Sequence, residues 1–140
     1  MRSFIDTNVL IYSDDSAFPE KREIAVELLT TLRRSGTGVL SIQVLQEYFA
    51  IATRKLGVEV SLAQRRMELF ARFDVVIPSI ALLSSAVDLH RLRSLSWWDA
   101  LVVQSAVSAG CSVLLSEDMQ HGATLSGVRI ENPFSDEQAA

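Results

Sequence analysis

The chain has few of the features that mark secreted, fibrous or membrane-spanning proteins. It contains one cysteine, Cys111, among 140 residues, so no disulfide can form within it, and a reducing compartment is expected. No apolar run approaches the roughly 18 residues of a membrane span. No repeat, low-complexity tract or linker divides the chain, and no signal peptide precedes the first predicted strand. These absences predict a cytoplasmic protein with no membrane partner.

Positive charge is also scarce. The net charge is −4, and eleven of the thirteen basic residues are Arg. A nucleic-acid binder that works through a broad basic surface is therefore disfavoured, although local arginine clusters can still hold phosphates. Nearly half of the residues are hydrophobic and 21% are charged, which indicates a compact globular chain. We expect one domain at 1–134 and a loosely ordered tail at 135–140.

The predicted strands are short, continuous apolar runs separated by helices. This pattern is typical of a parallel sheet that is covered on both faces. It predicts an α/β fold, a three-layer α/β/α sandwich with a mainly parallel sheet of four to five strands. The strands are expected at 3–5, 39–40, 75–77, 113–115 and, as a fifth, 128–130. The helices are expected at 19–34, 42–56, 61–72, 79–93 and 97–109.

Four acidic residues stand out because each lies at or near the end of an apolar segment: Asp6, Glu47, Asp99 and Asp118. Ligands of open α/β sheets bind beyond the carboxyl ends of the strands, and Asp6 and Asp118 each follow a strand. Four carboxylates brought together would repel one another, and a divalent cation is the usual relief. The sequence therefore indicates a Mg²⁺- or Mn²⁺-dependent phosphodiesterase, with a ribonuclease as the leading interpretation.

Two of these residues also have ordinary structural interpretations. Asp6 can close a strand in an Asx-turn, and Asn8 can do the same or cap a short helix at 9–12. The segment Ser96–Asp99 fits a capping box, and the helix after it is apolar on nearly every side. A carboxylate at the mouth of such a buried helix is costly unless it is paired. Asp99 can therefore cap the helix and also bind a metal.

The other acidic residues are less distinctive. Glu47 lies away from the main apolar face of its helix, either as a solvated glutamate or at the lip of a cleft. Glu117 and Asp118 can cap a following helix from residue 119 onward. Ser116 can hold a water or a neighbouring carboxylate. The pair at 14–15 is expected to be solvated in a turn.

Four segments together resemble the PIN-domain ribonucleases, most closely the VapC-like toxin subunits of bacterial toxin–antitoxin pairs. The segments are FIDTNVLIY, QEYFAIATRK, LSWWDALVVQSAVSAGC and LLSEDMQHG. The resemblance extends from Phe4 to about Phe134. It implies a doubly wound sheet, a Mg²⁺ or Mn²⁺ site, endonucleolytic cleavage of RNA, a homodimer and a small antitoxin that blocks the site. In it Asp6, Glu47, Asp99 and Asp118 match the acidic positions, with Asn8, Ser116 and Glu117 in support.

Those residues predict a division of roles. Asp6, Asp99 and Asp118 are the expected metal ligands, and Glu47 is either a ligand or the group that orients the attacking water. One metal or two remains open. Two pairs of basic residues are candidate RNA contacts, with a solvated helix surface as the alternative: Arg54 and Lys55, Arg91 and Arg93. His90 and His121 pair with none of the acids, which disfavours a metal-free mechanism with paired histidines.

Two other functions compete with this one. In a haloacid dehalogenase-type phosphatase Asp6 would be the nucleophile, but that motif needs a second aspartate where this chain has Asn8. It also needs a lysine, and neither Lys21 nor Lys55 follows a suitable strand. A PIN-like module that binds RNA or protein without cutting is the other alternative. The apolar stretches 24–32 and 62–73 are expected to form a dimer or antitoxin interface.

Overall fold

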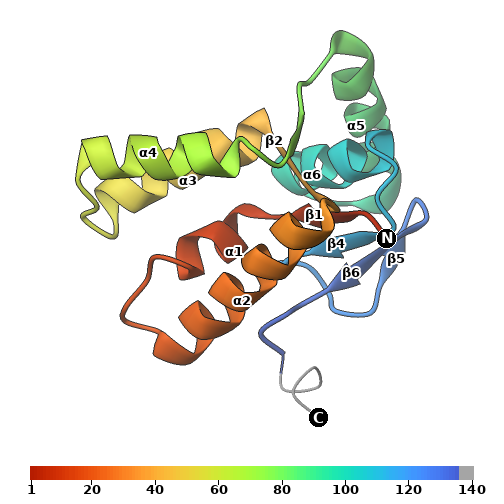
Figure 1. Ribbon diagram of the computed structural model, residues 1–140. Helices are drawn as coiled ribbons and strands as arrows, with labels where there is room; N and C mark the ends of the chain where they lie inside the picture. Colours follow the sequence, from red (N-terminus) through yellow and green to blue (C-terminus); the bar gives the residue numbers. More distant parts are fainter. Residues whose placement is uncertain (136–140) are drawn as a thin grey trace.

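The computed structural model describes residues 1–135 and has a six-stranded sheet between layers of helices (Figure 1). The strands are β1 (Ser3–Ile5), β2 (Gly38–Ser41), β3 (Asp74–Val76), β4 (Val113–Leu115), β5 (Thr124–Leu125) and β6 (Val128–Glu131). The helices are α1 (Thr7–Tyr12), α2 (Pro19–Ser35), α3 (Ile42–Arg54), α4 (Val60–Phe70), α5 (Ile80–Arg93) and α6 (Trp97–Ser108). None of these helices is both long enough and apolar enough to cross a membrane.

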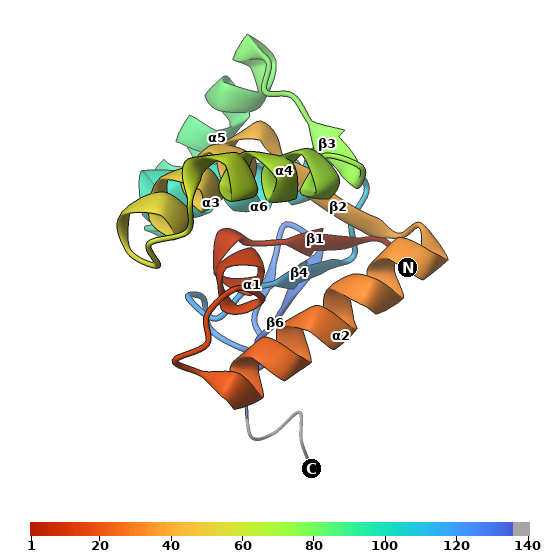
Figure 2. The same ribbon diagram turned by 60° about the vertical axis from the view of Figure 1, so that its left-hand side comes forward.

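The sheet has the order β3-β2-β1-β4-β6-β5, and only β5 runs antiparallel to its neighbour. The predicted α/β fold with a mainly parallel sheet is confirmed. The predicted count of four to five strands is wrong, because the two-residue β5 escaped notice. It forms a hairpin with β6 through Ser126 and Gly127, both at positive φ (51° and 83°). Helices α1 and α2 cover one face and α6 the other, with α5 outside α6 (Figure 2).

Serine residues cap the starts of three helices, and of these the Ser96 cap agrees with the capping box expected at Ser96–Asp99. Ser41 accepts a hydrogen bond from the backbone N–H of Val44 (3.3 Å) at the start of α3. Ser79 does the same for α5, and Ser96 for α6. Such caps satisfy amide groups that the first turn of a helix leaves unpaired. The directions of α3 and α6, which carry Glu47 and Asp99, are therefore set by local sequence.

Three local expectations are wrong. The helix expected at 61–72 begins one residue earlier, at Val60, and the Ser61 hydroxyl donates to Glu59 (2.8 Å). No helix follows Asp118, where the chain turns instead. The pair at 14–15 is not simply solvated: the Asp14 side chain is 4% exposed, accepts a hydrogen bond from Tyr48 and pairs with Arg66 (3.1 Å).

The middle of the sheet forms the core. Phe4, Leu40 and Leu114 on the three central strands are fully buried. Helix α6 is buried on several sides, as its apolar sequence predicted. Gly38 lies against Phe73, where a Cβ atom would come within 2.6 Å of the ring, so only glycine fits this close approach. A rigid central sheet therefore supports whatever lies at its carboxyl edge.

The expected loose tail at 135–140 lies outside the described residues apart from Ser135. Just before it, the Phe134 ring packs edge-on against Tyr12, with ring centroids 4.8 Å apart. This contact holds the end of the described chain against α1.

Candidate active site

Asp6 and Ser116 meet because β1 and β4 are adjacent and parallel. Ile5 lies opposite Leu115 in the register, so the residues that follow them leave the sheet at the same edge. The Ser116 hydroxyl donates to Asp6 Oδ2 (2.7 Å), and the backbone N–H of Thr7 donates to Oδ1 (2.8 Å). Asp6 therefore caps α1, the role that the sequence had offered to Asn8 as an alternative. Both carboxylate oxygens of this residue are held in place.

Asn8 and Ser116 together fix the loop that carries Asp118. The Asn8 side-chain amide donates to Asp118 Oδ2 (3.1 Å), and its carbonyl oxygen accepts from the backbone N–H of Glu117 (3.3 Å). Ser116 Oγ accepts from the backbone N–H of Asp118 (3.1 Å). Asn8 and Ser116 thus contact the acidic residues that the sequence predicted they would support.

Glu47 lies on α3 with its carboxylate directed toward α1. The Thr7 hydroxyl donates to Glu47 Oε2 (3.2 Å), and the Gln43 amide, one turn earlier on α3, donates to Oε1 (2.6 Å). Glu47 is partly buried, so its position is at the lip of a cleft and the alternative of a solvated surface glutamate is wrong. Thr7 links the two acids, since its amide contacts Asp6 and its hydroxyl contacts Glu47.

All four predicted acidic residues line one cavity of about 510 Å³ at the carboxyl edge of the sheet. Its walls come from α3, α6 and the loops after β1 and β4. The lining residues are Asp6, Gln43, Gln46, Glu47, Trp98, Asp99, Val102 and Asp118. Within the described chain, none of the residues that line this cavity is Lys, Arg or His. We name it the acidic cavity.

Burial and like charge act together on Asp6, which is 6% exposed. The pKa of Asp6 is raised from an ordinary value of 3.8 to about 6, chiefly by burial and to a lesser extent by the negative charges of Asp118 and Glu47. The hydrogen bonds from Ser116 and Thr7 lower the pKa, but they do not offset burial. A cation bound beside Asp6 would favour its ionised form.

The donor set fits a hard divalent cation. All four side chains offer carboxylate oxygens, the ligands that Mg²⁺ and Mn²⁺ prefer, and no basic side chain competes for them. Across residues 1–135, no three His, Cys, Asp or Glu side chains already lie close enough to share one ion. The carboxylates border an open space rather than a closed cage, which suits a cation that keeps several waters.

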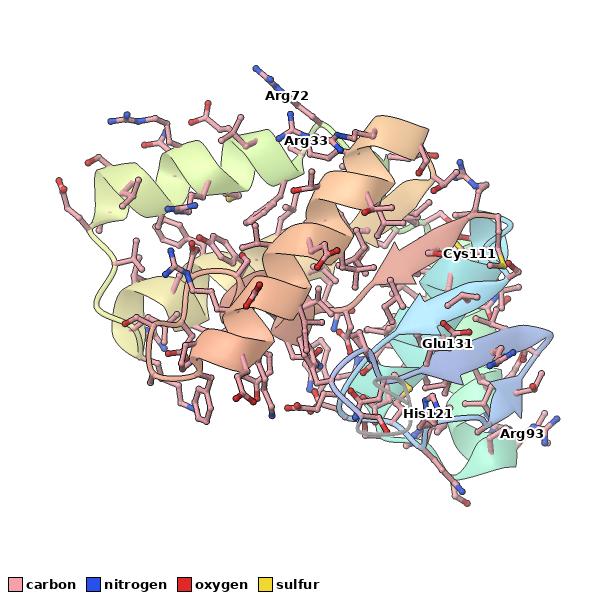
Figure 3. The ribbon with its side chains drawn as sticks, turned by 60° about the horizontal axis from the view of Figure 1, so that its bottom comes forward. Arg33, Arg72, Arg93, Cys111, His121 and Glu131 are labelled. Carbon is pink, nitrogen blue, oxygen red and sulfur yellow. The ribbon has the colours of Figure 1, made fainter. Side chains whose placement is uncertain are left out.

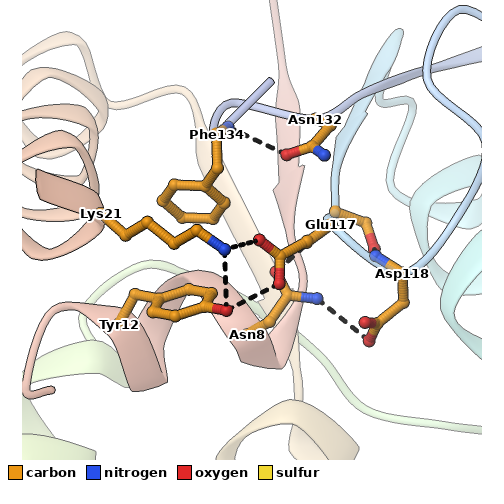
Figure 4. A network of polar contacts seen from close by, with 8 residues as sticks. Asn8, Tyr12, Lys21, Glu117, Asp118, Asn132 and Phe134 are labelled. Atoms are coloured by element: carbon orange, nitrogen blue, oxygen red, sulfur yellow. Dashed lines mark hydrogen bonds and ion pairs between the residues drawn. The ribbon is translucent and has the colours of Figure 1, made fainter. Parts of the chain in front are cut away.

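Glu117 does not share in this arrangement. Its carboxylate accepts hydrogen bonds from Tyr12 (2.7 Å) and from Lys21 Nζ (2.6 Å), on the far side of the loop from Asp118 (Figure 4). Lys21 also lies 4.7 Å from the centre of the Tyr12 ring. The contact with Glu117 raises the pKa of Lys21. Glu117 thus anchors the loop to α1 and α2, and it supports Asp118 from behind.

The candidate RNA contacts separate into two groups. Lys55 lines a second cavity of about 360 Å³ that shares Asp6, Glu47 and Asp118 with the acidic cavity. Arg54 is exposed at the end of α3, and Arg91 and Arg93 are exposed in the last turn of α5. Figure 3 shows Arg93 pointing outward into solvent. Of the four, only Lys55 lines a cavity beside the acidic residues within the described chain.

Both histidines have structural contacts away from the acidic cavity. His90 Nδ1 bonds the carbonyl of Leu95 at the end of α5. His121 Nδ1 accepts from the backbone N–H of Asn132 (3.0 Å). Neither lines the acidic cavity, in agreement with the expectation that neither acts in catalysis.

Sequence reasoning missed four residues that contact or line the site. Thr7 and Gln43 bind Glu47, while Gln46 and Trp98 line the acidic cavity. The signal for Gln43 was present, since it precedes Glu47 by four residues on a helix and such residues face each other. Trp98 precedes Asp99 in the sequence, but no pattern in the sequence indicated that its side chain would be exposed.

Comparison with known proteins gives the same fold. A family model described as PIN domain matches residues 3–123, most of the chain. No curated protein sequence matches. A toxin–antitoxin complex from Klebsiella pneumoniae has a TM-score of 0.70 and 19% identity, covering 94% of this chain and 98% of the other. VapBC2 from Rickettsia felis, bound to a DNA fragment from its promoter, has a TM-score of 0.68 and 16% identity, with coverage of 94% and 98%.

The third structure is VapC20 from Mycobacterium tuberculosis, a toxin that cleaves the sarcin–ricin loop. Its TM-score is 0.64 at 20% identity, over 83% of this chain and 89% of the other. At these identities the structures show a shared fold and no more. The family model extends from β1 through the loop that carries Asp118, and so includes every predicted acidic residue. The chain therefore belongs to the PIN domain family.

Proposed function

We propose that this protein is a metal-dependent endoribonuclease and the toxin component of a toxin–antitoxin pair. The observation that carries this proposal is the acidic cavity. Four carboxylate side chains line it, no basic side chain does so within the described chain, and the chain is a PIN domain. PIN-domain nucleases generally use divalent metal ions, and Mg²⁺ or Mn²⁺ suits an all-carboxylate set. The VapC20 neighbour, an RNA-cleaving toxin of the same fold, adds support.

Asp6, Asp99 and Asp118 would hold the metal, directly or through water, and Glu47 would be a further ligand or orient the attacking water. When bound, the metal would offset the phosphate charge and lower the pKa of a water. The protein fixes the ligands first: Ser116 and the Thr7 amide hold Asp6, and Asn8 holds Asp118. Gln43 and the Thr7 hydroxyl orient Glu47.

We further propose that an antitoxin binds the groove between α2 and α4. This groove encloses about 180 Å³ and is lined by Val26, Leu69 and Arg33 among others. Val26 and Leu69 are exposed, as are Ile24 and Leu62 from the stretches predicted to bind a partner. Exposed side chains of this kind commonly mark an interface. Figure 3 shows Arg33 at the outer end of α2.

A homodimer in the cytoplasm completes the proposal. Sequence reasoning had not picked out a second group of exposed apolar side chains on and beside α5, namely Ile77, Ile80 and Leu92. A second copy of the chain would cover these residues. The groove between α2 and α4 would then remain open to the antitoxin.

The phosphatase alternative finds little support in this geometry. Asn8 occupies the position of the second aspartate and bonds Asp118, and no lysine lines the acidic cavity within the described chain. That alternative also leaves Glu47 and Asp99 without a task. A PIN-like module that binds RNA without cutting is the other alternative, and cleavage assays distinguish it.

The test is to incubate partner-free protein with total bacterial RNA in Mg²⁺ or Mn²⁺ and to sequence the new RNA ends. EDTA and Asp99→Asn should abolish the cuts. Asp88→Asn is the matched control, because Asp88 is an exposed carboxylate on α5 that lines neither cavity at the site. Equal activity in wild type and a folded Asp99→Asn protein would rule out the acidic cavity as a nuclease site. RNA binding without cleavage would favour the non-catalytic module.

A further inference from the structure

Trp98 lies between two cavities of different chemistry. It is 62% exposed, although it stands at the start of a deeply buried helix. On one side it lines the acidic cavity, and on the other it lines a neutral cavity of about 230 Å³. Gln43 and Gln46 on α3 also line both. The two cavities are therefore adjacent and share this wall.

The neutral cavity has no charged residue among those that line it, within the part of the chain described. Its apolar surface comes from α3, α5 and α6, with Ile42, Pro78 and Leu82 as examples. The polar groups that it shares with the acidic cavity are two side-chain amides. A site of this kind suits a flat, neutral ligand that has hydrogen-bonding groups along its edge.

The two tryptophan side chains have different environments. Trp97 packs against the cluster of Leu82, Ala86 and Leu101 between α5 and α6, where it joins the two helices. Trp98 is left largely open to solvent beside Asp99. The Ser96 cap fixes this first turn of α6 through the backbone N–H of Asp99 (3.1 Å). The cap therefore fixes the backbone from which the indole and the carboxylate project.

We propose that the neutral cavity is a subsite for an unpaired RNA base beside the phosphate held at the acidic cavity. A nucleotide offers a charged phosphate and a neutral planar base, and the two adjacent cavities match these two parts. Trp98 would stack on the base, and the Gln46 amide would bond its edge. The subsite would serve the ribonuclease activity proposed above, on which it rests, and would make Trp98 the residue that binds the base beside the cleaved phosphate.

Charge complementarity favours a base over a protein segment at this position. The adjacent acidic cavity holds four carboxylates, and an RNA phosphate with a bound cation satisfies them. A base that is paired in a duplex cannot stack on a side chain, so the subsite selects unpaired nucleotides. Self-association through Trp98 is the competing occupant, and the test below separates the two.

Trp97→Phe makes Trp98 the sole tryptophan, because the chain has only two. A single-stranded oligoribonucleotide of mixed sequence should quench Trp98 fluorescence in Mg²⁺, read in the first milliseconds after rapid mixing, before cleavage. The same RNA annealed to its complement should not. Because this readout needs no catalysis, it tests the subsite even if the wild-type protein cleaves no RNA. Equal quenching by both RNAs, or by neither, would overturn the proposal.

Kinetics provide the second readout. Trp98→Leu keeps an apolar side chain but removes stacking, and it should raise KM between about fivefold and a hundredfold with little change in kcat. Trp98→Phe should restore most of the affinity. Val60→Ala is the matched control, since Val60 is 60% exposed but lines neither cavity. An unchanged KM and unchanged cut sites in Trp98→Leu would contradict the proposal. So would loss of a dimer, by sedimentation, in Trp98→Leu.

Discussion

Asp6→Asn should stabilise the metal-free protein, and the gain should grow with pH. The carboxyl group has a pKa of about 6 in the folded chain and 3.8 when unperturbed, chiefly because burial disfavours its charge. Below about pH 4 it is protonated in both states, so the difference in unfolding free energy between variant and wild type is constant. Between about pH 4 and 6 the unfolded chain ionises first, and the wild type loses stability that the variant keeps. The pKa shift corresponds to at most about 3 kcal/mol.

Urea unfolding in EDTA from pH 4 to pH 8 measures this difference. Asp88→Asn is the control, since it removes an exposed charge and reports the general effect of net charge. Mg²⁺ should then close most of this gap, because a ligand at a hundred times its Kd stabilises the wild type by about 2.7 kcal/mol. A difference between Asp6→Asn and wild type that stays flat with pH would refute the reasoning from burial. Equal stabilisation of both proteins by Mg²⁺ would refute the role of Asp6 as a ligand.

Three further changes test the surrounding structure. Lys21→Met removes the cation paired with Glu117 and should cost about 1 kcal/mol in urea unfolding, a small value because the pair is partly exposed. It should also weaken Mn²⁺ binding measured by calorimetry, since the loop loses its anchor; unchanged binding would contradict this. Gly38→Ala forces a Cβ atom to 2.6 Å from Phe73 and should cost about 1–3 kcal/mol in unfolding free energy. Leu114→Ala leaves a cavity in the central strand and should cost about 2–5 kcal/mol by the same assay.

Two glycine positions provide a matched comparison for the packing prediction. Gly57 has a positive φ of 66° and nothing within 4 Å of its added Cβ atom. Gly57→Ala therefore reports backbone strain alone, of about 1 kcal/mol, without a clash. If Gly38→Ala proved no more costly than Gly57→Ala, the close approach to Phe73 would not be the reason for glycine there.

The sequence predicted those parts of the site that depend on short-range rules. Strand ends carry ligands in parallel sheets, which was enough to bring Asp6 and Asp118 to one edge. The buried character of α6 and its serine cap followed from local patterns, and these place Asp99. Each of these inferences needs only the residues on either side and the general geometry of an α/β sheet.

The predictions that were wrong or absent concern residues whose contact partners are distant in the sequence. Asp14 looked like a turn residue because nothing local shows that Tyr48 and Arg66 bury it. The same holds for Lys21 and Glu117, which are 96 positions apart. The hairpin strand β5 is only two residues long, too short for a hydrophobic pattern to appear. Pairings of this kind come from tertiary packing, which a single sequence does not display.

The central place of the first strand has a consequence for synthesis on the ribosome. β1 is made first, yet its neighbour β4 is made more than a hundred residues later, and the bond from Ser116 to Asp6 spans 110 positions. A chain that is still being translated through α5 has neither Asp99 nor Asp118. The acidic cavity therefore cannot exist on a half-made chain. Any activity that it supports begins only after nearly the whole domain has left the ribosome.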